Sequence, residues 1–332
     1  MQHLNQIPKS WYVACPASHL SKYPVKFELF AKNIVGFRTQ DNKIVFIDEK
    51  YFNNEKIKPL EYKHVLNSRT CLRLAIIFKK IINEKTAMYL NELYFSCDKK
   101  YFAEEKHGYI WIWNKYCPPL FSVPAYPTKN IINYYSTCFS FYDVTKASVR
   151  RITENSFDYA HLTYLHGLES KNEIQVEVKD YSEKHFGESL VEPDYAFGAN
   201  LKWTEYTGVL GIITNILGLN SEHFELDINN WPSGQIVTLS ENGLPKYQLL
   251  LSTSPINQST TVQHIKIMFS KTNSSLFRDL YYFVLSSLQV KLTSDQDLPI
   301  FTDISETINP VYVSYDDVVI KYRNYFDKMC KN

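Results

Sequence analysis

The segment ENSFDYAHLTYLHG, residues Glu154–Gly167, is the part of this chain that decides how the rest is interpreted. Together with the preceding ASVRRIT it predicts one helix that ends in a turn at Gly167. Asp158 and His161 are three residues apart, so a helix places them on one face. His166 lies roughly 140° further round an ideal helix than His161. The two imidazoles therefore converge only if the helix deforms or ends between them, and Gly167 favours such an end.

Two histidines and a distant carboxylate are the ligand set of the non-haem iron(II) facial triad, which leaves positions open for oxygen and substrate. Zinc accepts the same donors. A lone aspartate–histidine pair at this spacing is more often a surface pair or a capped core histidine. The second histidine and Asn155 favour a metal site, but spacing by itself leaves both interpretations open.

The segments on either side of this motif predict an α+β fold. Residues 9 to about 115 contain short β-rich runs, with hairpin turns indicated at Lys32-Asn33 and Asp41-Asn42. SVPAYP at 122–127 is typical of a linker, so we divide the chain into a small all-β domain, 1–120, and a second domain, 121–332. The second domain begins with a strand and the motif helix. It continues with strands over 173–270, including a turn at Asn242-Gly243, and ends in two helices.

Composition excludes several classes of protein. The chain has 332 residues, 45% of them hydrophobic and 21% charged, with a formal net charge of +1. This balance gives no reason to expect nucleic acid or an anionic membrane as partner. The longest strongly apolar run, Gly208–Leu219, is too short to span a membrane, and no signal peptide is visible at the start. We therefore expect a cytoplasmic protein.

Several stretches, in order, resemble one known family. They are SWYVACPASHL at 10–20, NIVGFRTQDNKIVFIDEK at 33–50, HGYIWIW at 107–113, the motif itself, LSTSPINQSTTVQHIKIMFS at 251–270 and SDQDLPIFTD at 294–303. Over most of its length the chain resembles the α subunit of the Rieske non-haem iron oxygenases. The resemblance implies a small Rieske-like β domain followed by a helix-grip-like catalytic domain with a large antiparallel sheet and C-terminal helices.

The resemblance also implies roles for individual residues. His161 and His166 match the histidine ligands of a mononuclear Fe(2+). Asp297 matches the carboxylate ligand, with Asp295 as the alternative because the register there is uncertain. Asp158 matches the carboxylate that in the family links one subunit's iron site to a neighbour's cluster; alternatively, it orients His161 by accepting its second N–H. Asn155 matches a polar position beside the ligands.

The chain departs from the family at its [2Fe–2S] cluster, which two cysteines and two histidines hold. Alignment places Tyr51 and Asn53 at the first Cys-x-His pair, and Cys71 and Leu74 at the second pair. His64 fits neither pair. One ligand of four remains, so we predict a degenerate Rieske-like domain with no [2Fe–2S] cluster.

The resulting hypothesis is a non-haem iron oxygenase-like oxidoreductase that acts on a small organic substrate with O2, by hydroxylation, desaturation or oxidative rearrangement. Its electrons would come from the substrate, an external reductase or a cluster-bearing paralogue, in a homotrimer or hetero-oligomer. The alternative is a non-catalytic or partner subunit of a Rieske oxygenase-type assembly, which binds a small molecule or completes a mixed oligomer. We expect neither nucleic acid nor membrane as partner.

Overall fold

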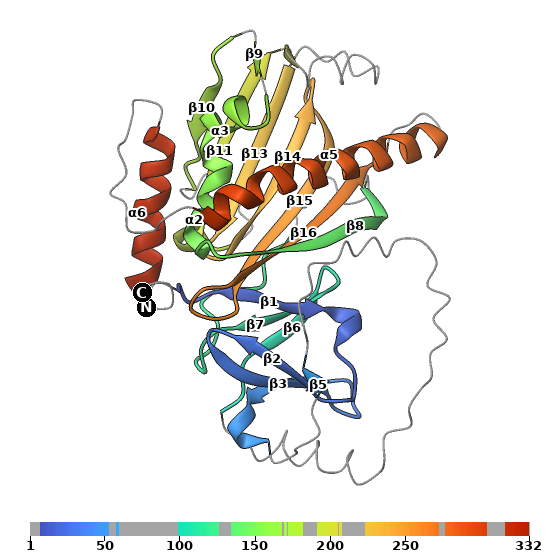
Figure 1. Cartoon of the computed structure of the whole chain (residues 1–332), viewed down its shortest axis with the longest axis vertical. Helices are drawn as coiled ribbons and strands as arrows, with labels where there is room; N and C mark the ends of the chain where they lie inside the picture. The colour runs from blue at the N-terminus through green and yellow to red at the C-terminus, as the bar shows by residue number, and fades with distance from the viewer. Residues whose placement is uncertain are drawn as a thin grey trace.

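The computed structural model describes residues 7–52, 58–59, 99–125, 134–167, 169–170, 172–181, 191–204, 206–207, 223–271, 276–303 and 316–331. Two small sheets from the first third of the chain lie at one end of a large antiparallel sheet, which carries the helices (Figure 1). This arrangement confirms the α+β fold class. The division near residue 120 stays a prediction.

The small sheets are built from strands β1 to β7. One has the order β1-β7-β6 and the other the order β4-β3-β2-β5. Their bounds are β1 Trp11–Pro16, β2 Val25–Leu29, β3 Lys32–Arg38, β4 Ile44–Asp48, β5 Lys58–Pro59, β6 Ala103–Lys106 and β7 Tyr109–Trp113.

Strand β7 shows why this part of the chain packs against the large sheet. Every residue of its sequence YIWIW is buried. Side chains alternate between the two faces of a strand. Ile110 and Ile112 accordingly join one hydrophobic cluster, whereas Trp111 and Trp113 join another that contains Trp231 of the large sheet. The rings of Trp111 and Trp231 are 6.0 Å apart.

The hairpin between β2 and β3 differs from the prediction. Its turn is formed by Phe30 and Ala31, which have positive φ, and Lys32 already begins β3. The N–H groups of Phe30 and Ala31 donate to the carbonyls of Pro255 and Ile256 at the end of β15 (2.9 and 2.8 Å). A long-range contact therefore places this turn, where the local signal at Lys32-Asn33 is wrong. The turn at Asp41-Asn42 is confirmed, since Asn42 has φ 63°.

The large sheet has seven strands in the order β10-β11-β13-β14-β15-β16-β8, and all neighbours are antiparallel. Their bounds are β8 Tyr134–Thr145, β10 Gln175–Val178, β11 Phe197–Thr204, β13 His223–Trp231, β14 Gly234–Glu241, β15 Leu244–Pro255 and β16 Thr261–Ser270; β9 Glu169–Ser170 and β12 Tyr206–Thr207 form a separate pair. The predicted turn at Asn242-Gly243 joins β14 to β15, with φ of 49° and 75°. Positive φ at both central residues is what such a two-residue hairpin requires.

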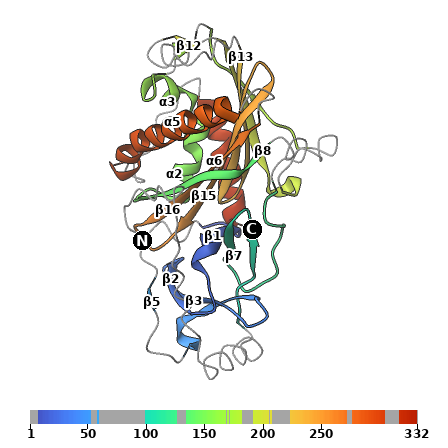
Figure 2. The same cartoon turned by 90° about the vertical axis from the view of Figure 1, so that its right-hand side faces the viewer.

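Helices cover one face of this sheet. α2 (Val149–Glu154), α3 (Tyr159–Tyr164) and α5 (Leu276–Asp303) lie on the same face, and α5 crosses the strands (Figures 1 and 2). α6 (Asp317–Lys331) buries Val318, Tyr322 and Phe326 at helical spacing, as its amphipathic sequence predicts. Within the described ranges, no helix has the length and apolar character needed to cross a membrane.

A buried ion cluster joins α2 to α6. The carboxylate of Glu154, the last residue of α2, accepts hydrogen bonds from Arg151 (2.6 Å) and from two nitrogens of Arg323 (2.7 and 2.9 Å). Only 4% of Glu154 is exposed. Such bidentate, charge-assisted hydrogen bonds fix the relative orientation of the two side chains as well as stabilising the contact. They hold the end of α2 immediately before Asn155.

Candidate metal centre

The motif segment is not the single helix that the sequence predicts. α2 begins after Ser148, whose hydroxyl accepts the N–H of Arg151 (3.3 Å). A short 3-10 helix, Asn155–Phe157, follows, and the backbone then leaves the helical region at Asp158, with φ −83° and ψ 87°. The prediction failed because it treated Asp158 as a helix-interior residue.

Asp158 is the residue that starts the second helix. Its Oδ1 atom accepts the backbone N–H groups of Ala160 (3.1 Å) and His161 (3.3 Å). These N–H groups have no partner within the helix, and a carboxylate also suits the positive end of the helix dipole. Asp158 therefore gives α3 a new start and sets the direction in which His161 projects.

The two histidines meet because α3 is short. α3 ends at Tyr164, and Gly167 has φ 64°, so His166 lies beyond the helix end. The imidazole rings of His161 and His166 have centroids 5.0 Å apart and lie edge to face. The helix therefore ends between His161 and His166, as the convergence of the two imidazoles requires.

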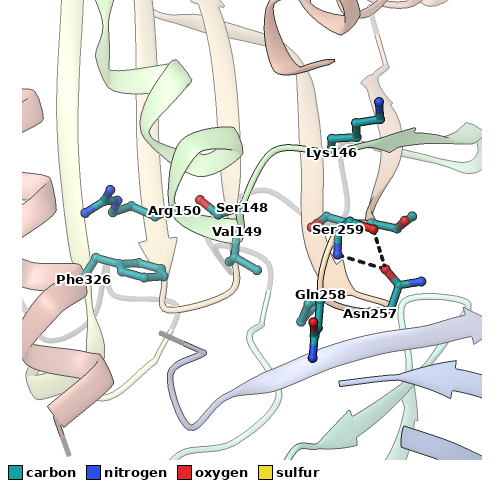
Figure 3. A pocket seen from close by; sticks show the side chains of 11 residues that line it. Lys146, Ser148, Val149, Arg150, Asn257, Gln258, Ser259 and Phe326 are labelled. Atoms are coloured by element: carbon teal, nitrogen blue, oxygen red, sulfur yellow. Dashed lines mark hydrogen bonds between the residues drawn. The ribbon is translucent and has the colours of Figure 1, made fainter. Parts of the chain in front are cut away.

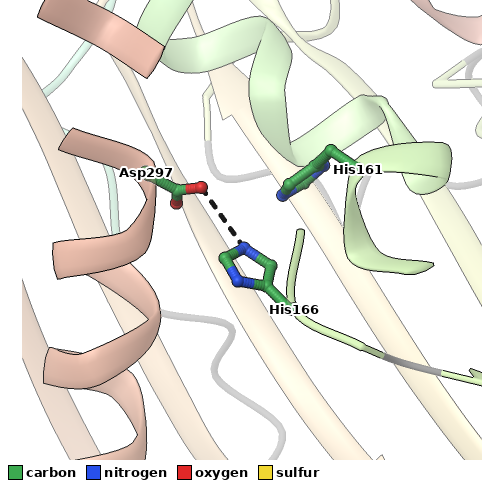
Figure 4. A group of neighbouring side chains, drawn as sticks. All are labelled: His161, His166 and Asp297. Carbon is green, nitrogen blue, oxygen red and sulfur yellow. Dashed lines mark ion pairs between the residues drawn. The ribbon is translucent and has the colours of Figure 1, made fainter. Parts of the chain in front are cut away.

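Asp297 reaches the same place from α5, far along the chain. Its Oδ1 is 3.2 Å from Nε2 of His166. One donor atom each from His161, His166 and Asp297 lies within 4.8 Å of the other two (Figure 4). The alternative, Asp295, instead pairs with Lys291 on its own helix and has a side chain 46% exposed. The geometry favours Asp297.

Hydrogen bonds at Nδ1 of both rings leave Nε2 as the nitrogen that can bind a cation. Nδ1 of His161 contacts the backbone carbonyl of Asp158, and Nδ1 of His166 lies 2.8 Å from Oε1 of Gln296. Both partners are oxygens that accept, so each Nδ1 carries the proton and each Nε2 keeps its lone pair. Neutral imidazole in this tautomer is the form that ligates a metal.

The contact between Nε2 of His166 and Oδ1 of Asp297 indicates which kind of ion fits between these two atoms. Nε2 of His166 and Oδ1 of Asp297 are both buried, and neither makes a well-formed hydrogen bond with any residue the structure describes. With Nδ1 protonated, two lone pairs face each other at 3.2 Å. Such an arrangement is unfavourable unless a proton or a metal ion lies near both atoms. The donor set therefore fits a divalent metal.

The pKa directions agree with this charge pattern. Burial lowers the pKa of His166, but the neighbouring Asp297 carboxylate and the Gln296 amide oxygen outweigh this effect, so the net pKa is raised. Burial is the main cause that lowers the pKa of His161. The carboxylate of Asp297 thus favours the charged form of His166, whereas burial disfavours the charged form of His161.

Asn155 and Asp158 both lie beside the triad. Nδ2 of Asn155 is 3.3 Å from Nε2 of His161. Only the backbone carbonyl of Asp158 contacts the His161 ring, since its carboxylate caps α3. In this structure Asp158 accepts the ring N–H of His161, as the alternative expects, but through its backbone carbonyl rather than its carboxylate.

Gln296 is a site residue that the sequence reasoning missed. Its neighbours Asp295 and Asp297 are candidate ligands because they are carboxylates. The residue spacing gives no reason to select the glutamine between them. An amide next to a candidate carboxylate ligand is the one signal that could have identified it. It acts on His166 from 130 residues away.

Of the four positions aligned with the cluster ligands, the structure describes Tyr51. It packs against the small apolar cluster that contains Val35, Phe37 and Phe52, and Lys50 lies over its ring, 5.0 Å from the centroid. Asn53, Cys71 and Leu74 lie outside the described residues, as does His64. The absence of a cluster stays a prediction.

A separate cavity lies between the start of α2, the turn joining β15 to β16, and α6 (Figure 3). Its polar lining includes Lys146, Arg150, Asn257 and Ser259. Oδ1 of Asn257 accepts the backbone N–H of Ser259 (3.0 Å) and its hydroxyl (3.3 Å). The lining includes none of the five predicted site residues, so this cavity is distinct from the triad.

The chain is similar to proteins whose names describe oxygenases, although no family model matches it. It is 26% identical over 337 residues to the aminopyrrolnitrin oxygenase PrnD of Pseudomonas fluorescens, covering 97% of this chain and 91% of that protein. Dicamba monooxygenase bound to 3,6-dichlorosalicylic acid has a similar structure (TM-score 0.64, 14% identity, 98% of each chain). Pseudomonas putida NdmA with caffeine is also similar (TM-score 0.59, 14% identity, 99% of this chain and 92% of that one). The solved structures show a shared fold.

Proposed function

We propose that this chain, a member of the Rieske non-haem iron oxygenase family, is an iron(II)-dependent oxidoreductase that acts on a small organic substrate with O2. The reaction would be a hydroxylation, a desaturation or an oxidative rearrangement. The observation that carries the proposal is the convergence of His161, His166 and Asp297 within 4.8 Å. Two imidazoles and one carboxylate are the iron(II) facial triad.

The chain's own residues would prepare this site. The Asp158 carbonyl and the Gln296 side chain hold the Nδ1 protons, so both Nε2 lone pairs point into the site. The Asn155 amide lies at its edge, where it can donate a hydrogen bond to a bound ligand. When bound, iron(II) supplies the one-electron chemistry that O2 activation needs, with positions left open for O2 and substrate.

We further propose that no [2Fe–2S] cluster is present in the chain. A phenol, an amide and an isobutyl group cannot replace a thiolate and two imidazoles. The packed position of Tyr51 supports this at the first of the four ligand positions. Electrons would then come from the substrate, an external reductase or a cluster-bearing paralogue.

We also propose that the chain works as an oligomer, most simply with further copies of itself. One face of α5 carries a row of exposed large apolar side chains: Phe277, Leu280, Tyr281, Val284, Leu288 and Leu292. Such a row marks an interaction surface in an otherwise ordinary water-facing helix. If it joins copies, Leu288→Glu reduces the mass measured by light scattering, whereas Thr302→Glu further along α5 leaves it unchanged. A cytoplasmic location remains our prediction from the sequence.

The decisive experiment measures iron and acid-labile sulfide per chain in protein purified without oxygen. One iron and no sulfide would support the proposal. Iron together with sulfide would contradict the cluster-free part. Protein that binds neither iron nor Co2+ after reconstitution would overturn the metal site and favour the alternative, a non-catalytic or partner subunit.

Matched variants then test the ligands. His161→Ala, His166→Ala and Asp297→Asn should each remove bound metal while circular dichroism shows an intact fold. His223→Ala, at an exposed histidine of β13, is the control and should retain metal. Unchanged metal content in the triad variants would refute the assignment.

A further inference from the structure

Helix α5 carries Asp297 and is held to the sheet through apolar side chains, among them Phe283, whose ring centroid lies 4.7 Å from that of Phe269. Val290 packs in a cluster with Phe141 and other residues of the sheet, and Phe301 packs with Ile152. Most other described side chains of α5 are partly or fully exposed. Asp297 lies between Val290 and Phe301 along α5. A further contact is needed to fix the rotation of the helix about its axis, and with it the direction of the Asp297 side chain.

Asp143 on β8 makes that contact. It is a carboxylate only 6% exposed, on the edge strand that α5 crosses. Its Oδ2 accepts a hydrogen bond from the Ser294 hydroxyl, and its Oδ1 is 3.7 Å from Nζ of Lys291. Nζ of Lys291 also lies 5.1 Å from the ring centroid of Phe141, two residues earlier on β8. Burying a carboxylate costs free energy, so the presence of one at this position calls for an explanation.

We propose that Asp143 is a positioning residue for the metal site, which acts by fixing helix α5 and thereby the carboxylate of Asp297. This inference rests on the proposed function. Ser294 precedes Asp297 by three residues, slightly less than one helical turn, so the two side chains share a face of α5.

The required precision explains why a polar contact is used. Ligand distances in a metal site hold within roughly 0.2 Å. A carboxylate about 6 Å from the axis of its helix moves about 2 Å when that helix turns by about 20°. Hydrophobic contacts such as those of Val290 tolerate sliding, whereas the directional bond from Ser294 to Asp143 does not. Asp143 thus restricts the rotation that would separate Asp297 from His166.

The test measures Co2+ affinity and the visible spectrum of bound Co2+ in the full chain, with thermal stability recorded separately. Asp143→Ala should weaken Co2+ binding about tenfold or more and change the intensity of the visible bands. Ser294→Ala, which removes only the hydroxyl, should shift both in the same direction by less. Asp143→Asn, which keeps an acceptor for Ser294, should restore much of the affinity.

Asp227→Asn is the matched control, since Asp227 is a strand aspartate that also pairs with a lysine, Lys179, away from α5. It should bind Co2+ as the wild type does. If Asp143→Ala and Ser294→Ala lose stability but keep wild-type Co2+ affinity and spectrum, the role is merely structural and the inference is wrong. If wild type itself binds no Co2+ and His161→Ala behaves identically, the proposed function fails first.

Discussion

The buried carboxylate of Glu154 gives the most direct prediction about stability. Arg323→Met removes two of its three hydrogen bonds to arginine, at 2.7 and 2.9 Å, and keeps the Arg151 bond at 2.6 Å. Methionine retains most of the aliphatic bulk of the arginine stem, so the change isolates the charge contact. The substitution leaves a buried negative charge with one partner instead of two.

The expected cost follows from these contacts. A hydrogen bond to a charged group contributes about 1.5–3 kcal/mol, and breaking a buried pair costs about 3–5 kcal/mol. Because Glu154 is only 4% exposed, water can compensate little of this. We expect Arg323→Met to lower the free energy of unfolding by about 3–4 kcal/mol. Urea unfolding, monitored by tryptophan fluorescence, will show this loss as a lower midpoint urea concentration, with an unchanged dependence of the unfolding free energy on urea.

The double variant separates burial from pairing. In Glu154→Leu with Arg323→Met, no buried charge remains, and Arg151 can reach water. We expect it to be more stable than Arg323→Met alone, since an apolar replacement of a buried pair is often neutral or better. A single variant within about 1 kcal/mol of wild type, or a double variant less stable than the single one, would refute the reasoning.

Three further predictions concern the site and its surroundings. Gln296→Leu should weaken Co2+ binding about tenfold, because His166 loses the acceptor that fixes its tautomer, and Gln296→Glu should strengthen it. Asp295→Asn should retain metal whereas Asp297→Asn loses it, as metal analysis of both will show. Burial lowers the pKa of His264 to about 3. Below about pH 6.5 the unfolded chain therefore binds a proton at His264 that the folded protein does not bind, and the free energy of unfolding falls as the pH falls. From pH 7 to 5 this loss should be about 2 kcal/mol larger in wild type than in His264→Gln by urea unfolding.

Each of these three has a control. Gln289→Leu changes an exposed glutamine two turns earlier on α5 and should leave Co2+ affinity unchanged. Metal loss in Asp295→Asn but not in Asp297→Asn would reverse the ligand assignment. Equal pH dependence in wild type and His264→Gln would mean that His264 is protonated in the folded protein near its ordinary pKa.

Much of the fold could be predicted from local patterns. The alternating runs gave the strands of the large sheet, and the amphipathic C-terminal segment gave α6, because burial on one face imposes a period of 2 or 3.6. The Asn242-Gly243 turn was also predictable, since both residues tolerate positive φ. The β2–β3 turn was not, because contacts with the end of β15 place it.

The sequence alone singled out His161, His166, Asp158 and Asn155, since four chemically useful residues within twelve positions form a recognisable pattern. It could not choose between Asp295 and Asp297, since both lie on one helix and its rotation decides which carboxylate faces inward. The break at Asp158 and the acceptors for the two Nδ1 protons were also hidden, because they depend on backbone direction and on α5. Only the tertiary structure brings α3 and α5 across the same sheet face, where residues 130 positions apart can hold one another in place.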